Sequence, residues 1–185
     1  MTSTFRRRAV QGFTLIELLI VVIIIAILAA IAIPQFSNSS GDAQESASIA
    51  NLTTMRSAIE LYRAQHNGRY PSRAPEGAAP ATACPTAGSA VDNNTNTFRD
   101  QLSMFSSASG HTCTTAVAGY IYGPYLRVIP SEPVTNSNAV VVVSDDATTP
   151  AGANTVGWRF QNVNGALQIN TTRLARDGVT LLSAK

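Results

Sequence analysis

The chain contains 185 residues, which is enough for one ordinary domain and one additional element. Apolar side chains make up 45% of the chain and charged side chains only 13%, which excludes a charge-rich disordered protein, while a mean hydropathy of +0.09 is too low for a polytopic membrane protein. The net charge is +2, and Arg6, Arg7 and Arg8 supply more than this excess, so the rest of the chain lacks the basic surface expected of a nucleic-acid-binding protein.

A long apolar segment begins shortly after these arginines. Between Phe13 and Ile33 the only polar side chains are Thr14 and Glu17. As a helix, this segment would span about 31 Å, close to the hydrocarbon thickness of a bilayer. Three interpretations are open: a secretory signal peptide cleaved near residues 30–32, a plain membrane anchor with a cytoplasmic N-terminus, or a membrane helix retained behind a short leader. The length of the segment and the carboxylate inside it argue against the signal peptide.

A specific motif favours the third interpretation. The G-F-T-L-I-E-L run that begins at Gly12, followed by the apolar segment and Pro34, resembles the class III signal of type IV pilins and of the pseudopilins of type II secretion. In that family a prepilin peptidase removes a short basic leader after the glycine and methylates the new N-terminus. The resemblance implies a leader over residues 1–12 and an N-methylated Phe13. It also implies that Glu17, the fifth residue of the mature chain, pairs with the N-terminal amine of a neighbouring subunit and sets the register between subunits.

The cost of placing Glu17 in a membrane helix supports a functional role for this residue. A carboxylate costs about 2.5–3.5 kcal/mol at the centre of a membrane helix, and less near its end, so such residues usually have a partner. Cleavage after Gly12 would leave a cationic amine one helical turn away. The alternatives are a carboxylate that reaches the membrane interface or one that is protonated.

The helix is expected to continue past the membrane and assembly segment, residues 13–33, into an amphipathic half, residues 34–71. Pro34 lacks a backbone donor, so we expect a kink there. Apolar residues at helical spacing then form one stripe, which we interpret as core: Ile49, Leu52, Met55, Ile59 and Tyr62. The helix should end near His66, because Gly68 follows it. The E-L-Y-R and N-G-R-Y-P runs within residues 60–71 also resemble the end of the long helix in major pseudopilins.

Residues 72–185 are expected to form a globular α+β head, packed on the long helix through a small antiparallel sheet. A proline-rich surface loop should cover residues 72–96, and a short helix Thr97 to Ser106, with Thr97 and Asp100 at capping-box spacing. Strands are expected at Ala139 to Val143, Val156 to Val163, Ala166 to Thr171 and Val179 to Leu182, the middle two joined by a two-residue hairpin at Asn164-Gly165. The resemblance implies that these elements form the type IV pilin-like fold.

Cys84 and Cys113 are the two cysteines of the chain, and their spacing is wrong for a zinc site. If the head lies outside the cytoplasm, a disulfide between them is the leading interpretation. His111 lies close to Cys113 in the sequence, and a Cys–His nucleophile pair is the alternative to a loop histidine beside a disulfide. The sequence contains no G-x-S-x-G, H-E-x-x-H or P-loop motif, so we expect no enzyme activity.

Calcium is the one cofactor that the resemblance raises. Major pseudopilins commonly hold calcium in a loop after a G-P-Y-L run, which is residues 123–126 here, often with a D-P-W-G motif nearby. The corresponding residues 130–136 depart from that pattern. Glu132, Asp145 and Asp146 could supply oxygen ligands, but a solvated acidic loop is the favoured interpretation, so we expect no cofactor.

The resemblance implies a structural subunit of a type II secretion pseudopilus. Such a subunit is anchored in the inner membrane by one helix, with its N-terminus in the cytoplasm and its head in the periplasm, before it enters a periplasmic or extracellular filament. The expected partners are copies of itself, the prepilin peptidase, the inner-membrane assembly platform and the minor pseudopilins. A type IV pilus pilin for adhesion, motility or DNA uptake is the alternative within the family. A membrane-anchored periplasmic binding or enzymatic domain is the alternative outside it.

Overall fold

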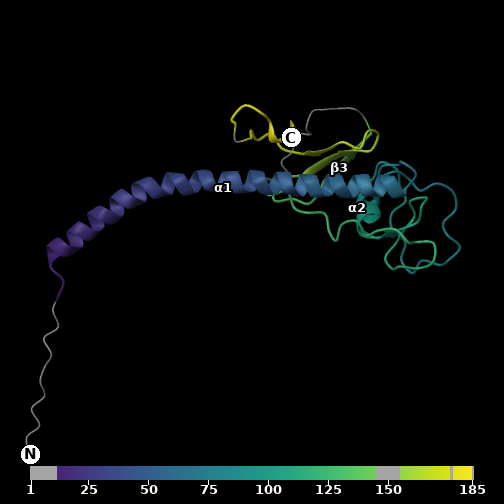
Figure 1. Ribbon diagram of the computed structural model, residues 1–185, viewed down its shortest axis with the longest axis horizontal. Coiled ribbons are helices and arrows are strands. Elements are labelled where there is room, and N and C mark those ends of the chain that lie inside the picture. Colours follow the sequence, from purple (N-terminus) through teal and green to yellow (C-terminus); the bar gives the residue numbers. More distant parts are fainter. Residues whose placement is uncertain (1–11, 145–154, 176, 185) are drawn as a thin grey trace, which may run out of the picture. The chain divides into compact units, whose positions relative to one another are not determined.

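The computed structural model describes residues 12–144, 155–175 and 177–184, without the side chains of residues 34–40. The chain divides into two compact units, Met1–Gly41 and Asp42–Lys185. Helix α1 (Leu15–Gln65) contributes to both units, and the other described elements lie in the second (Figure 1). One long helix followed by a short helix and small sheets confirms the predicted α+β class.

Helix α1 begins two residues after the expected start and ends at Gln65, close to the expected end. Its helical backbone continues through Pro34, and the kink expected at this residue stays a prediction. Gly68 has a positive φ of 79°, and its N–H donates to the carbonyl of Arg63 at 2.9 Å. Because glycine adopts this conformation without steric cost, it closes the helix as the sequence predicted.

The second half of α1 presents an apolar stripe to the core of the head. Four of the five expected residues are buried: Leu52, Met55, Ile59 and Tyr62. The fifth, Ile49, is 37% exposed, so its assignment to the core is wrong. Ser48 is buried in its place, because its hydroxyl donates to the carboxylate of Glu132 at 2.6 Å.

Helix α2 (Thr95–Ser103) starts and ends earlier than expected. Asn94 is its N-cap, since the side-chain oxygen of Asn94 accepts from the backbone N–H groups two and three residues ahead. The capping box expected at Thr97 and Asp100 is therefore wrong. The hydroxyl of Thr97 instead accepts from the N–H of Val91 at 3.1 Å, which holds the preceding loop against the helix.

A short strand replaces the last residues of the expected short helix. Strand β1 (Phe105–Ser106) pairs antiparallel with β2 (Thr112–Cys113). Ser106 also exchanges two backbone hydrogen bonds with Tyr122, at 2.8 and 3.1 Å. Because these partners lie outside the helical segment, the tertiary pairing outweighs the helical spacing of the local sequence.

The larger sheet has the order β3-β4-β5 and is mixed rather than antiparallel. Strand β3 (Val140–Val143) runs parallel to β4 (Trp158–Gln161), whereas β4 and β5 (Leu167–Ile169) are antiparallel. The expectation of an antiparallel sheet is thus wrong for β3. Residues 144–157 join β3 to β4 and provide the length that a parallel crossover requires.

The connection from β4 to β5 is longer than the expected two-residue hairpin. The N–H of Gln161 donates to the carbonyl of Ala166 at 2.9 Å, so residues 162–165 form the turn. Near the C-terminus, the segment expected as a strand at Val179 to Leu182 makes antiparallel backbone contacts with residues 173–175 but forms no extended strand. A single bridge joins Leu174 to Leu181 there, and η1 (Leu182–Ala184) follows it.

The central strand β4 is buried on both faces. Trp158 and Phe160 are fully buried, and the ring of Phe160 lies 4.6 Å from that of Phe98 in α2. The indole N–H of Trp158 donates to the carbonyl of Pro130 at 2.8 Å. The alternate residues Arg159 and Gln161 are also buried. The core of the head therefore forms where β4 meets α1 and α2.

His66 directly follows α1 and is buried at its end. Its Nδ1 lies 2.7 Å from the carbonyl oxygen of Tyr62, and its Nε2 lies 3.0 Å from the hydroxyl of Ser106. The imidazole ring also stacks on the ring of Tyr62, with 3.8 Å between centroids. Burial lowers the pKa of His66 below its ordinary value, and the nearby carbonyl opposes this shift only in part.

We expect the head to lose stability as the pH falls below about 6.5, the ordinary value for histidine. Because the pKa of His66 is lower in the folded state, the unfolded state binds the proton more readily. The contribution of His66 to the stability of the head is therefore complete above the pKa of His66 in the unfolded state, and it is lost as the pH falls below that pKa. Urea titrations between about pH 8 and about pH 5.5, followed by the fluorescence of the single tryptophan, measure this loss.

The variant His66→Gln keeps a polar side chain at this position but does not titrate. It should be less stable than the wild type at about pH 8, and its stability should depend less on pH over the same interval. An unchanged pH dependence in this variant would contradict the role of His66.

Candidate functional site

The first part of α1 is a continuous exposed apolar surface. Leu15–Ile33 is long and apolar enough to cross a membrane, with a mean hydropathy of 3.3, and none of it is buried by the described residues. Its large apolar side chains are between 50% and 83% exposed. Soluble monomers rarely expose such a surface, so this segment needs lipid or other apolar helices around it.

Glu17 lies in the first turn of α1 and forms a capping box with Thr14. Glu17 Oε2 accepts from both the backbone N–H and the hydroxyl of Thr14, each at 2.8 Å. The Thr14 hydroxyl in turn accepts from the N–H of Glu17 at 3.3 Å. This reciprocal arrangement satisfies donors that a helix N-terminus otherwise leaves unpaired. The T-x-x-E spacing of residues 14–17 is the sequence signal of this capping box. It identifies Thr14 as a further residue of the site, which the resemblance to the pilin family did not single out.

Gly12 and Phe13, the residues of the predicted cleavage site, precede α1. The side chain of Phe13 is 85% exposed. Among the described residues, and apart from the chain neighbours of Gly12, no atom lies within 4 Å of the position that a Cβ on Gly12 would occupy. Their processing and the role of Glu17 in assembly remain predictions.

Cys84 and Cys113 form the predicted disulfide, with 5.7 Å between their Cα atoms. The bond joins the proline-rich loop to β2, and Ala87 in the same loop forms a backbone bridge with Cys113. Neither cysteine is free, so the alternative Cys–His nucleophile pair is wrong. His111 instead places its Nε2 at 3.2 Å from the carbonyl oxygen of Gly77.

Glu132 is fully buried and fastens its loop to α1. Its Oε1 accepts from the hydroxyl of Ser48 at 2.6 Å and from the N–H of Val134 at 3.0 Å, while its Oε2 accepts from the N–H of Thr135 at 2.6 Å. A solvated acidic loop is therefore the wrong description of this residue. Its carboxylate oxygens are occupied by protein donors.

The other two calcium candidates, Asp145 and Asp146, lie outside the described residues. Within the described ranges, no group of three or more histidine, cysteine or acidic residues is arranged to hold a metal ion.

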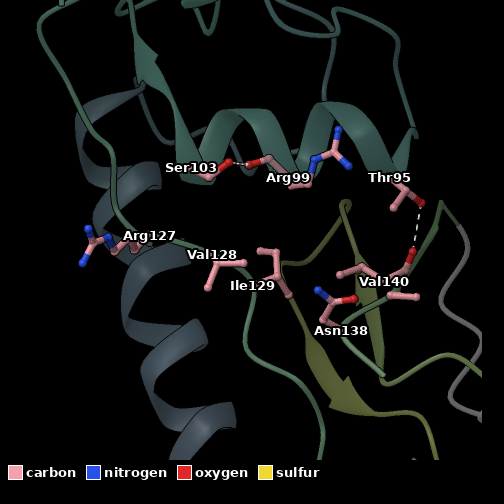
Figure 2. Close-up of a pocket in the computed structure, with 9 residues that line it drawn as sticks. Thr95, Arg99, Ser103, Arg127, Val128, Ile129, Asn138 and Val140 are labelled. Carbon is pink, nitrogen blue, oxygen red and sulfur yellow. Dashed lines mark hydrogen bonds between the residues drawn. The ribbon is translucent and has the colours of Figure 1, made fainter. Parts of the chain in front are cut away.

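A hollow of about 330 Å³ opens on the head between α2 and the start of β3 (Figure 2). Its hydroxyl groups are used within the protein: Thr95 donates to the carbonyl of Val140 at 2.9 Å, and Ser103 donates to that of Arg99 at 2.8 Å. The lining contains arginine, asparagine and aliphatic side chains but no histidine, cysteine or carboxylate. This hollow therefore offers no acid–base pair for catalysis.

The prokaryotic N-terminal methylation motif matches residues 7–33. The type II secretion system core protein G of Klebsiella michiganensis is 31% identical over 67 residues, which cover 36% of this chain and 46% of that protein. Over its N-terminal part, the chain is similar to type IV pilin-like proteins. Its apolar helix and class III signal fit a pilin anchored in the inner membrane.

The pilin-like protein is also similar to type IV pilins. The type IV major fimbrial protein FimA of Dichelobacter nodosus is 58% identical over 50 residues, which cover 27% of this chain and 32% of that protein. The type IV major pilin protein PilE1 of Neisseria gonorrhoeae is 42% identical over 69 residues, covering 37% and 32% of the two chains. The matches span less than half the length of these relatives. No solved structure matches the chain.

Proposed function

We propose that this pilin-like protein is a structural subunit of a type II secretion pseudopilus, made as a prepilin and polymerised through its N-terminal helix. The observation that carries the proposal is the methylation motif at residues 7–33, which includes an apolar helical segment, Leu15–Ile33, that no described residue buries. Lipid would remove this surface from water before assembly, and the same segment of neighbouring copies would do so in the filament. The similarity to core protein G supports a type II secretion system as the assembly that contains this subunit.

Glu17 supplies the specific contact in an otherwise apolar interface. In the single chain its carboxylate is held by the donors of Thr14. Cleavage after Gly12 would create a cationic amine at Phe13, and the amine of a neighbouring copy could then pair with Glu17. Pairing would neutralise two charges in a low-dielectric environment, where an unpaired charge is costly, and would fix how far one helix is displaced along its neighbour.

The same proposal gives the topology of the subunit. Arg6, Arg7 and Arg8 would hold the N-terminus in the cytoplasm by the positive-inside rule, which places the head in the periplasm. The Cys84–Cys113 disulfide is consistent with an oxidising compartment. Partners would be other copies of the chain, the prepilin peptidase, the inner-membrane assembly platform and minor pseudopilins.

A type IV pilus pilin is the second candidate. It is supported by the sequence identities to FimA and PilE1, which are higher than the identity to core protein G. Deletion of the gene from its host separates the two functions. A pseudopilus subunit should be required for protein export and dispensable for surface pili. Loss of surface pili with normal export would assign the chain to a pilus instead.

We expect the mature protein to begin at an N-methylated Phe13. The basis is the position of Gly12 between the basic leader and the apolar helix. Intact-mass measurement of membrane-extracted protein gives the N-terminus directly, and Gly12→Leu should retain the leader as a control.

Two results would contradict this processing. A mature N-terminus near residue 33 would indicate an ordinary signal peptidase. A leader retained in the wild-type protein would favour a binding or enzymatic head on a plain membrane anchor.

A further inference from the structure

A basic hollow of about 400 Å³ lies in the head beside the C-terminal end of α1. Three arginines and one glutamate contribute all of its formal charge: Arg63, Arg69, Arg73 and Glu76. Tyr70, Gly68 and Val163 complete the lining. The hollow thus brings together residues from α1, the loop that follows α1 and the turn between β4 and β5.

The three guanidinium groups are held in place before any ligand arrives. Each donates to a backbone carbonyl: Arg63 to Gly68 at 3.3 Å, Arg69 to Ala74 at 2.8 Å and Arg73 to Asn162 at 3.3 Å. The guanidinium of Arg63 also lies over the ring of Tyr70, 4.7 Å from its centroid. These contacts use part of each donor set and limit the freedom of the side chains, which lowers the entropy that binding would cost.

The hollow carries more positive than negative charge. Glu60 lies 3.4 Å from Arg63, and Glu76 lies 2.9 Å from Arg69, and both carboxylates are mostly exposed. Within the described part of the chain, Arg73 forms no ion pair. One cation is therefore left without a carboxylate partner, while the two existing partners are free to move away into solvent.

Arg69 also has an incompletely satisfied donor in this hollow. Its Nη1 is buried and forms no hydrogen bond to the described residues, although it is ion-paired with Glu76 Oε1 at 2.9 Å. A buried donor without a hydrogen bond is costly, and the ion pair with an exposed carboxylate compensates this cost only in part. An oxyanion in the hollow could accept from this donor and pair with Arg73 as well.

We propose that this hollow is an oxyanion site that takes a carboxylate or a phosphate group. Guanidinium groups bind both of these anions through paired N–H donors, and such charge-assisted hydrogen bonds are roughly twice as strong as neutral ones. The ligand would accept from Arg69 Nη1 and pair with Arg73, displacing the exposed carboxylate of Glu76. The residues of this site lie outside the assembly segment, residues 13–33, so the proposal stands or falls independently of the pseudopilus proposal.

Isothermal titration calorimetry on the full chain in detergent tests the site, with inorganic phosphate and succinate as probes at constant ionic strength. We expect saturable binding of at least one probe to the wild type. Arg73→Gln should weaken it about tenfold, as for the loss of one hydrogen bond to a charged group. Glu76→Gln should tighten it severalfold, because the competing carboxylate is gone. Arg127→Gln is the matched control, since it removes an exposed arginine outside the hollow and should leave the affinity unchanged.

The variants separate a specific site from general electrostatics and from misfolding. Opposite effects of Arg73→Gln and Glu76→Gln support the site, because an unfolded head cannot bind more tightly. The tighter of the two probes identifies the group that the hollow takes. An absence of saturable binding by either probe, equal losses in Arg73→Gln and Arg127→Gln, or no gain in Glu76→Gln would overturn the proposal.

Discussion

Replacement of Glu17 by alanine is expected to lower filament yield by at least about tenfold while leaving leader removal intact. Removal of one member of a buried charge pair costs about 2–5 kcal/mol, and each 1.4 kcal/mol is a factor of about ten in an equilibrium constant. Processing should be normal, because the peptidase is expected to act at Gly12, which the substitution leaves unchanged. Recovery of filaments in the sheared fraction, beside an immunoblot of processed and unprocessed protein, measures both effects.

Two further variants distinguish charge pairing from helix capping. Thr14→Ala removes the hydroxyl of the capping box but keeps the carboxylate, and loss of a cap costs only about 0.5–2 kcal/mol. Glu60→Ala removes an exposed carboxylate from the head portion of α1 and should assemble normally. A loss in Thr14→Ala as large as that in Glu17→Ala would mean that capping carries the effect. Wild-type filament yield from Glu17→Ala would remove Glu17 from its proposed role.

Removal of the disulfide should destabilise the head by about 3.5 kcal/mol on the chain-entropy model. The bond joins residues separated by 29 positions and closes a loop that contains part of the proline-rich segment, α2 and β1. The variant with serine at both Cys84 and Cys113 should therefore unfold at a lower urea concentration. The fluorescence of Trp158, which is fully buried in β4, reports this transition.

Reduction of the wild-type protein gives a matched control for the serine variant. Both samples should unfold at nearly the same urea concentration, since both lack the restraint. Intact mass after alkylation without reductant should show no modified thiol. Two alkylated cysteines in the native protein would contradict the bond, and equal stability of oxidised and reduced protein would show that the loop needs no such restraint.

The sequence by itself determined the elements whose signals lie in neighbouring residues. The apolar run before Pro34, the helical stripe from Leu52 to Tyr62 and the terminating Gly68 all depend on local spacing or local backbone conformation. The class III signal is likewise contiguous, so its resemblance to the pilin family was visible before any contact was known. The cysteine pair could be predicted because only one pairing is possible with two cysteines.

Only the tertiary structure decided the properties that depend on distant partners. The local periodicity of the sequence does not show that β3 runs parallel to β4. It also does not show that Ser48 is buried while Ile49 is exposed. Ser48 and Glu132 meet although 84 positions separate them, which turns a predicted surface carboxylate into a buried one. The arginines of the basic hollow depend in the same way on carbonyls from other segments. Burial and charge pairing are properties of the folded neighbourhood, because desolvation and Coulomb energy depend on distance in space rather than along the chain.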